Sequence, residues 1–130
     1  MAEGTFVTAI NCMDGRVQEP VIKWMKQRFE ADYVDSITEP GPDRIMVSGP
    51  AYLQDSIKTR VDISVNGHGS RVVAVVAHHD CTGYPVSKDE HLAGLPTCTA
   101  LIESWRFSVR ILAIWLDENW QVEVISDSGG

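Results

Sequence analysis

An uninterrupted apolar run that stops at polar residues is the clearest pattern along this chain. Residues 72–77 read VVAVVA, without a charge, and the next four residues are HHDC. A continuous, β-branched run of this length is typical of a strand that is buried on both faces of a parallel sheet. Ligands of such sheets bind beyond the carboxyl ends of the strands. We therefore expect a functional site where this strand ends.

Strand and helix patterns alternate along the rest of the chain. Short apolar or β-branched runs predict strands over residues 5–10, 33–38, 71–77 and 121–125. Apolar residues at helical spacing predict a helix that begins near residue 18, a helix from residue 51 to about 66, and a long helix over residues 97–119. Residues 39–50 hold three prolines and two glycines, which predicts a loop. The alternation favours a single α/β domain over residues 1–130, with a mainly parallel central sheet of about four strands flanked by helices.

Composition and charge narrow the range of partners. A chain of 130 residues, 44% of them hydrophobic, can bury a core without disulfide bonds. The net charge of −7 disfavours binding to nucleic acid or to an anionic membrane surface. The amino-terminal residues lack the pattern of a signal peptide, and no apolar run approaches the roughly 20 residues that cross a bilayer. We therefore expect a cytoplasmic protein that acts on a small molecule.

The cysteines and one histidine suggest a metal site at the expected sheet edge. Cys12 follows the first predicted strand, whereas His78 and Cys81 follow the third. If these two strands are neighbours, two thiolates and one imidazole would fill three corners of a tetrahedral zinc site and leave the fourth for water, as in catalytic zinc sites. The remaining Cys98 falls within a helical pattern and is expected in the core.

Two charged residues close to Cys12 add to this hypothesis. Asp14 and Arg16 alternate with it along the segment CMDGR. A guanidinium beside Asp14 would keep the carboxylate ionised and oriented. Because an ionised carboxylate can only accept hydrogen bonds, it would orient a zinc-bound water or hydroxide toward the substrate.

The segments CMDGR at residues 12–16 and HHDC at residues 78–81 resemble the C-x-D-x-R and H-x-x-C motifs of the β-class carbonic anhydrases. The resemblance implies that Cys12, His78 and Cys81 bind zinc at the carboxyl edge of the sheet, and that an Asp14–Arg16 dyad orients the fourth zinc ligand. It implies reversible hydration of carbon dioxide to bicarbonate by zinc-bound hydroxide, and a homodimer or higher homo-oligomer.

Release of a proton after each turnover would require a further group. Imidazole titrates in the required pH range. The candidates are His79, His91 and His68, and the neighbouring Asp80 is a candidate for supporting the ligands. The tryptophans at residues 105, 115 and 120 are expected to serve packing or a subunit interface.

Departures from the family pattern leave alternatives open. Residues 38–44 read TEPGPDR where the family usually carries asparagine, alanine and glycine, and Thr82 separates Cys81 from a glycine. The substrate could therefore be carbon disulfide or carbonyl sulfide, hydrolysed at the same site. A second alternative is a catalytically silent zinc module with Asp14 as a fourth ligand, which would not require Arg16. A third is an enzyme with a Cys12 nucleophile, which would leave His78 and Cys81 unexplained.

Overall fold

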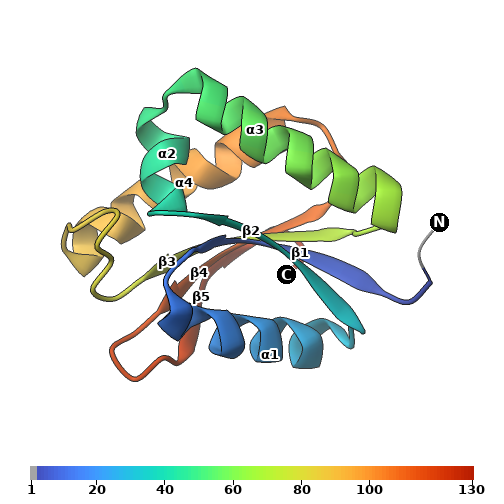
Figure 1. Cartoon of the computed structure of the whole chain (residues 1–130), viewed down its shortest axis with the longest axis horizontal. Coiled ribbons are helices and arrows are strands. Elements are labelled where there is room, and N and C mark those ends of the chain that lie inside the picture. Colours follow the sequence, from blue (N-terminus) through green and yellow to red (C-terminus); the bar gives the residue numbers. More distant parts are fainter. Residues whose placement is uncertain (1–2) are drawn as a thin grey trace.

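A five-stranded sheet forms the centre of the computed structural model, which describes residues 3–130 (Figure 1). The strands are β1 (Phe6–Cys12), β2 (Tyr33–Glu39), β3 (Val72–His78), β4 (Arg110–Leu116) and β5 (Val122–Asp127). Their order across the sheet is β2-β1-β3-β4-β5, with β1 to β4 parallel and β5 antiparallel to β4. The predicted single-domain α/β fold with a mainly parallel sheet is confirmed, with five strands where about four were expected.

Helices cover both faces of this sheet. Helix α1 (Gln18–Phe29) covers one face, and α2 (Pro42–Ser48), α3 (Ala51–Asp62) and α4 (Lys88–Ser104) cover the other (Figure 1). A short 3-10 helix (Gly15–Val17) precedes α1, and a π-helical turn (Ile63–Gly67) extends α3. The buried apolar residues accordingly form two clusters, one on each face. None of the helices within residues 3–130 has the length and apolar character that crossing a membrane requires.

The three central strands are buried on both faces, as the continuous apolar run of β3 predicts. In each of β1, β3 and β4 a half-buried first residue is followed by six buried ones. Burial of a valine or isoleucine side chain contributes about 1.5–3 kcal/mol. The parallel register, which pairs Ile10 with Val75 and His78 with Leu116, brings the carboxyl ends of all three strands to one edge.

The prediction of one helix over residues 97–119 is wrong. Helix α4 begins earlier, at Lys88, where the Ser87 hydroxyl accepts a hydrogen bond from the backbone N–H of Glu90. It ends at Ser104, and Arg106 and Ser108 then adopt left-handed φ angles of 62° and 57°, which turn the chain back toward the sheet. The following apolar run enters the sheet as β4. A segment that is apolar throughout matches the helical and the strand period equally well.

The prediction of a loop over residues 39–50 is also wrong, because this segment contains α2. Pro42 occupies the first turn of α2, where its missing N–H has no helical partner, and Gly49 and Pro50 follow its end. The prolines and glycines therefore mark the two ends of the helix. Ile45 and Met46 are buried in the core cluster on this face, and this tertiary packing stabilises a helix of only seven residues.

Candidate metal centre

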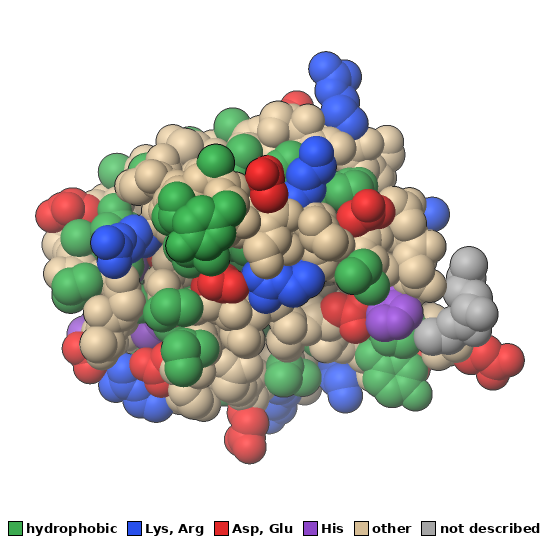
Figure 2. Space-filling view, turned by 45° about the horizontal axis from the view of Figure 1, so that its top comes forward, with side chains coloured by type: hydrophobic (Ala, Val, Ile, Leu, Met, Phe, Trp, Pro, Cys, Tyr) green, Lys and Arg blue, Asp and Glu red, His purple; other side chains and the backbone are tan. Residues whose placement is uncertain are grey.

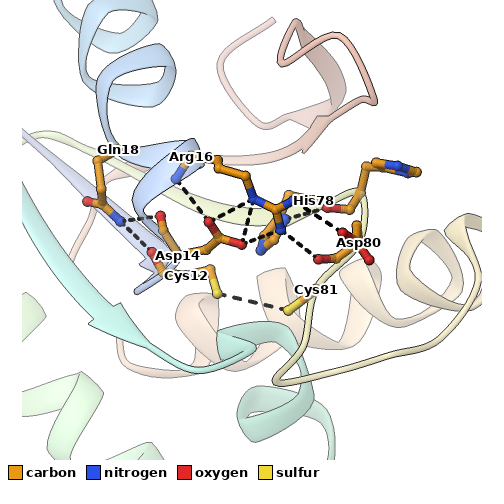
Figure 3. A network of polar contacts seen from close by, with 8 residues as sticks. Cys12, Asp14, Arg16, Gln18, His78, Asp80 and Cys81 are labelled. Atoms are coloured by element: carbon orange, nitrogen blue, oxygen red, sulfur yellow. Dashed lines mark hydrogen bonds and ion pairs between the residues drawn. The ribbon is translucent and has the colours of Figure 1, made fainter.

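Cys12, His78 and Cys81 converge at the carboxyl edge of the sheet (Figure 3). Cys12 ends β1, His78 ends the neighbouring β3, and Cys81 lies in the loop that follows β3. The two sulfur atoms are 3.9 Å apart, and the potential ligand atoms of the three residues lie within 4.8 Å of one another. All three residues are buried. They are therefore close enough to bind one metal ion together.

The hydrogen bonds of His78 leave one ring nitrogen free for a metal ion. Its Nδ1–H donates to the backbone carbonyl of His79 at 2.7 Å, which leaves the lone pair on Nε2. Nε2 is buried and has no hydrogen-bond partner within residues 3–130. A buried polar atom without a partner destabilises the fold by about 1–3 kcal/mol. A metal ion bound to Nε2 would remove this cost. Metal-binding histidines commonly donate their other N–H to a carbonyl in this way, so the cluster fits a metal ion.

The two thiols of the cluster influence each other. The hydrogen bond between them lowers the pKa of Cys12 and raises the pKa of Cys81, and burial raises both. Burial lowers the pKa of His78, but the nearby Cys12 sulfur and the His79 carbonyl outweigh it, so that this pKa is raised. In the metal-free protein Cys12 is therefore the thiolate that forms first.

Asp14 and Arg16 form the ion pair that the sequence predicts. Arg16 donates from Nη2 to Asp14 Oδ2 at 2.6 Å and from Nε to both carboxylate oxygens at 3.1 and 3.2 Å. Asp14 also caps the 3-10 helix by accepting the Arg16 backbone N–H at 2.9 Å. These bonds lower the pKa of Asp14 to about 2. The carboxylate is consequently an ionised acceptor beside the cluster at neutral pH.

Arg16 is itself held by two further segments. Its Nη1 lies 3.1 Å from Asp80 Oδ2, and its Nη2 donates to the Asp80 carbonyl at 3.0 Å (Figure 3). Its guanidinium also stacks on the ring of Trp120, 4.9 Å from the centroid. Trp120 lies in the turn between β4 and β5, which the sequence pattern placed just after a helix, so this contact was missed. Trp120 adopts a left-handed φ of 58° in this turn, and the sequence pattern does not indicate that conformation.

The four candidate residues for proton release or ligand support lie in different places. His79 and Asp80 are exposed in the loop beside the cluster. His91 is buried in α4, where its Nδ1–H donates to Asp43 Oδ2 at 2.5 Å. His68 stacks on Phe6, the first residue of β1, and so lies at the opposite edge of the sheet from the cluster.

A cavity lies next to the cluster. It has a volume of about 640 Å³, and its lining includes Cys81, the exposed His79 and Asp80, and the start of α4. Small molecules can therefore approach Cys81 from this side.

Comparisons with known proteins agree with this architecture. A family model with the description "Putative carbonic anhydrase" matches residues 2–126. A search of curated proteins finds no match. Among solved structures, the β-carbonic anhydrase isoform I of Trichomonas vaginalis has a TM-score of 0.62 at 12% identity, over 92% of this chain and 81% of that one. The carbonic anhydrase of Glaciozyma antarctica has a TM-score of 0.61 at 15% identity, over the same shares of the two chains.

Structures described as tetrameric β-carbonic anhydrases from Sordaria macrospora are also similar, with a TM-score of 0.59 at 9% identity, over 98% of this chain and 84% of that one. At such identities the structural likeness shows the fold. The family model, in contrast, spans nearly the whole chain, as expected from the CMDGR and HHDC motifs. The chain therefore belongs to the carbonic anhydrase family that this model describes, and it has the fold of the β-class enzymes.

Proposed function

We propose that the protein catalyses the reversible hydration of carbon dioxide to bicarbonate with a zinc ion held by Cys12, His78 and Cys81. The observation that carries this proposal is the set of three buried ligand atoms within 4.8 Å of one another, which includes the unpartnered Nε2 of His78. Two sulfurs and one imidazole are a donor set that zinc prefers. Three protein ligands leave the fourth position for a water molecule, as in catalytic sites.

Zinc bound here would lower the pKa of a coordinated water molecule to about 7 and so supply hydroxide near neutral pH. Asp14 would orient this nucleophile, because its ionised carboxylate accepts a hydrogen bond and cannot donate one. Arg16 would hold Asp14 through the bonds described above. The proton that remains would pass to solvent through the loop that carries the exposed His79.

The contacts of Asp14 favour a catalytic site over a silent structural one. A closed site would need Asp14 as a fourth ligand, but both of its carboxylate oxygens accept hydrogen bonds from Arg16. Within residues 3–130, the cluster of potential ligands around the two sulfurs consists of Cys12, His78 and Cys81 alone.

We further infer a homodimer or larger assembly in the cytoplasm. Strand β2 forms an edge of the sheet, and its first residue, Tyr33, is 52% exposed, so a second subunit would cover it. The similar proteins of Sordaria macrospora are described as tetrameric. The three cysteines are all unpaired thiols, which suits a reducing compartment. Light scattering at micromolar concentration should give at least twice the chain mass of 14.4 kDa, and a monomer would contradict this assembly.

Metal analysis combined with stopped-flow hydration tests the function. The wild type should contain about one zinc per chain, and Cys12→Ser should lose both zinc and activity. Asp14→Asn should keep its zinc and hydrate carbon dioxide about 10–100-fold more slowly, because only the orienting carboxylate is lost. Cys98→Ala is the matched control, since Cys98 is also buried but lies outside the cluster, and it should retain both.

Other outcomes would replace the proposal. Full zinc with turnover of carbonyl sulfide or carbon disulfide, and none of carbon dioxide, would change the substrate. Full zinc without turnover of any of the three would support the silent module. Activity that survives a chelator would indicate a Cys12 nucleophile.

A further inference from the structure

Two loops meet beside the candidate metal centre. One leads from β2 to α2 through Pro40 and Gly41, and the other follows β3 and carries Cys81. Within the second loop, the backbone N–H of Tyr84 donates to the carbonyl of Cys81 at 3.3 Å. The position of this loop therefore determines where the sulfur of Cys81 lies relative to Cys12 and His78.

The two loops are packed backbone against backbone. A Cβ atom on Gly83 would lie only 2.5 Å from the carbonyl carbon of Pro40 and 2.7 Å from the nitrogen of Gly41. Gly41 also has a φ of 62°, which favours glycine. In addition, Arg44 Nη1 donates to the carbonyl of Gly83 at 3.3 Å. A displacement of one loop must therefore move the other.

A buried hydrogen bond between two side chains joins these loops to the core. His91, in α4, donates from Nδ1 to Asp43 Oδ2 at 2.5 Å, and the two side chains are 0% and 2% exposed. Asp43 lies in the first turn of α2, two residues after Gly41. The His91 ring also packs edge-on against Tyr84, with ring centroids 4.9 Å apart. His91 thus contacts the start of α2 and the loop after β3 at the same time.

The stability of the fold does not require such a pair. Replacing both partners of a buried hydrogen bond by apolar groups of the same shape can be nearly neutral or stabilising. His91 Nε2 and the neighbouring Trp115 Nε1 are also buried without a hydrogen-bond partner among residues 3–130. Buried polar groups without partners lower the stability of the fold. Their presence here therefore suggests a functional role in the neighbouring site.

We propose that the Asp43–His91 pair positions the loop of Cys81 against the start of α2, and thereby tunes how tightly Cys12, His78 and Cys81 hold a metal ion. Asp43 and His91 are positioning residues, since they act through Gly41, Gly83 and Tyr84. The inference rests on the proposed metal site but not on the substrate of the enzyme. A positioning role agrees with the burial of His91, whereas transfer of protons to solvent would require an exposed side chain.

Two reciprocal substitutions of His91 test this inference. His91→Phe keeps the aromatic contact with Tyr84 and removes the donor to Asp43, whereas His91→Asn keeps an amide N–H near the position of Nδ1. In His91→Phe the zinc dissociation constant should rise about 10-fold, and the sulfur-to-cobalt charge-transfer band of the cobalt-substituted protein should shift. His91→Asn should lie closer to the wild type in both measurements. Asp43→Asn, which keeps the shape of the side chain, should change both in the direction of His91→Phe.

Ile102→Ala is the matched control. Ile102 is buried in the same helix as His91, but it lies near the opposite end of α4. This variant should unfold at a lower temperature and leave the charge-transfer band and the dissociation constant unchanged. If the wild type binds cobalt and zinc but the His91 and Asp43 variants behave like Ile102→Ala, the inference is wrong and the proposed function stands. If the wild type binds neither metal, both are wrong.

Discussion

His78 and His79 are neighbours in the sequence, yet their side chains have different surroundings. His78 is the last residue of β3 and is 1% exposed, whereas His79 is exposed in the loop. The His79 carbonyl accepts the Nδ1–H of His78 and so leaves Nε2 of His78 free. The spacing H-x-x-C favours His78 as the ligand, but which ring nitrogen is free depends on a backbone carbonyl that the sequence does not place.

The Asp14–Arg16 pair leads to a prediction about pH. Hydrogen bonds from Arg16 lower the pKa of Asp14 to about 2, so Asp14 should stay ionised from about pH 4 to 9 and should not limit activity in that range. In Arg16→Gln the pKa of Asp14 should rise toward the ordinary value of about 3.9. The carboxyl ¹³C chemical shift of Asp14, followed by NMR from pH 7 downward, measures this change.

The lowered pKa of Asp14 also determines how the stability of the fold depends on pH. Because the folded pKa is depressed, the pair stabilises the fold above the ordinary pKa, and this contribution is lost as the pH falls toward about 2. Arg28→Gln is the control, since it removes the same charge from an arginine that pairs instead with Asp127. A pKa of Asp14 that stays near 2 in Arg16→Gln would show that Arg16 is not its cause.

At the scale of elements, the sequence predicts best those segments whose pattern allows only one interpretation. The apolar run of β3 and the helical spacing of α1 and α3 fall into this class, and the neighbouring positions of β1 and β3 bring the two motifs together as expected. The strand β4 was missed because its apolar run also fits a helix. Helix α2 was missed because tertiary packing stabilises it. These errors hid Trp120, which follows β4, and Asp43, which lies in α2.

The contact between the two loops leads to a prediction for Gly83. In Gly83→Ala the new Cβ would lie 2.5 Å from backbone atoms, so the loop of Cys81 must shift. Overpacking of this kind destabilises a protein by about 1–3 kcal/mol. We expect a lower melting temperature and a lower zinc content after dialysis against a weak chelator.

Gly15→Ala is the control for this substitution. Gly15 lies within the CMDGR segment, close to the same cluster. Apart from its two neighbours in the chain and the backbone of its own short helix, no atom of residues 3–130 would lie within 4 Å of a Cβ at this position. It should therefore retain the zinc content of the wild type. If Gly83→Ala keeps its zinc as well as Gly15→Ala does, the packing of the two loops does not determine metal binding.

At the scale of the whole molecule, the fold explains why the site lies where it does. Three parallel strands, buried between two helical layers, end at one edge, where Cys12 and His78 are the last residues of two of them and Cys81 follows shortly after. On the face shown in Figure 2, acidic and basic side chains are interspersed among separate hydrophobic groups, so the net charge of −7 is not gathered there into one patch. The family model over residues 2–126 and the two sequence motifs show the family to which the chain belongs.

A zinc titration of the metal-free protein, followed by stopped-flow hydration of carbon dioxide, tests the central claim most directly. The hydration rate should rise in proportion to added zinc and reach a plateau at one equivalent per chain, because Cys12, His78 and Cys81 form one cluster of potential ligands within residues 3–130. A rate that stays at the uncatalysed value when one equivalent of zinc is bound would contradict the account.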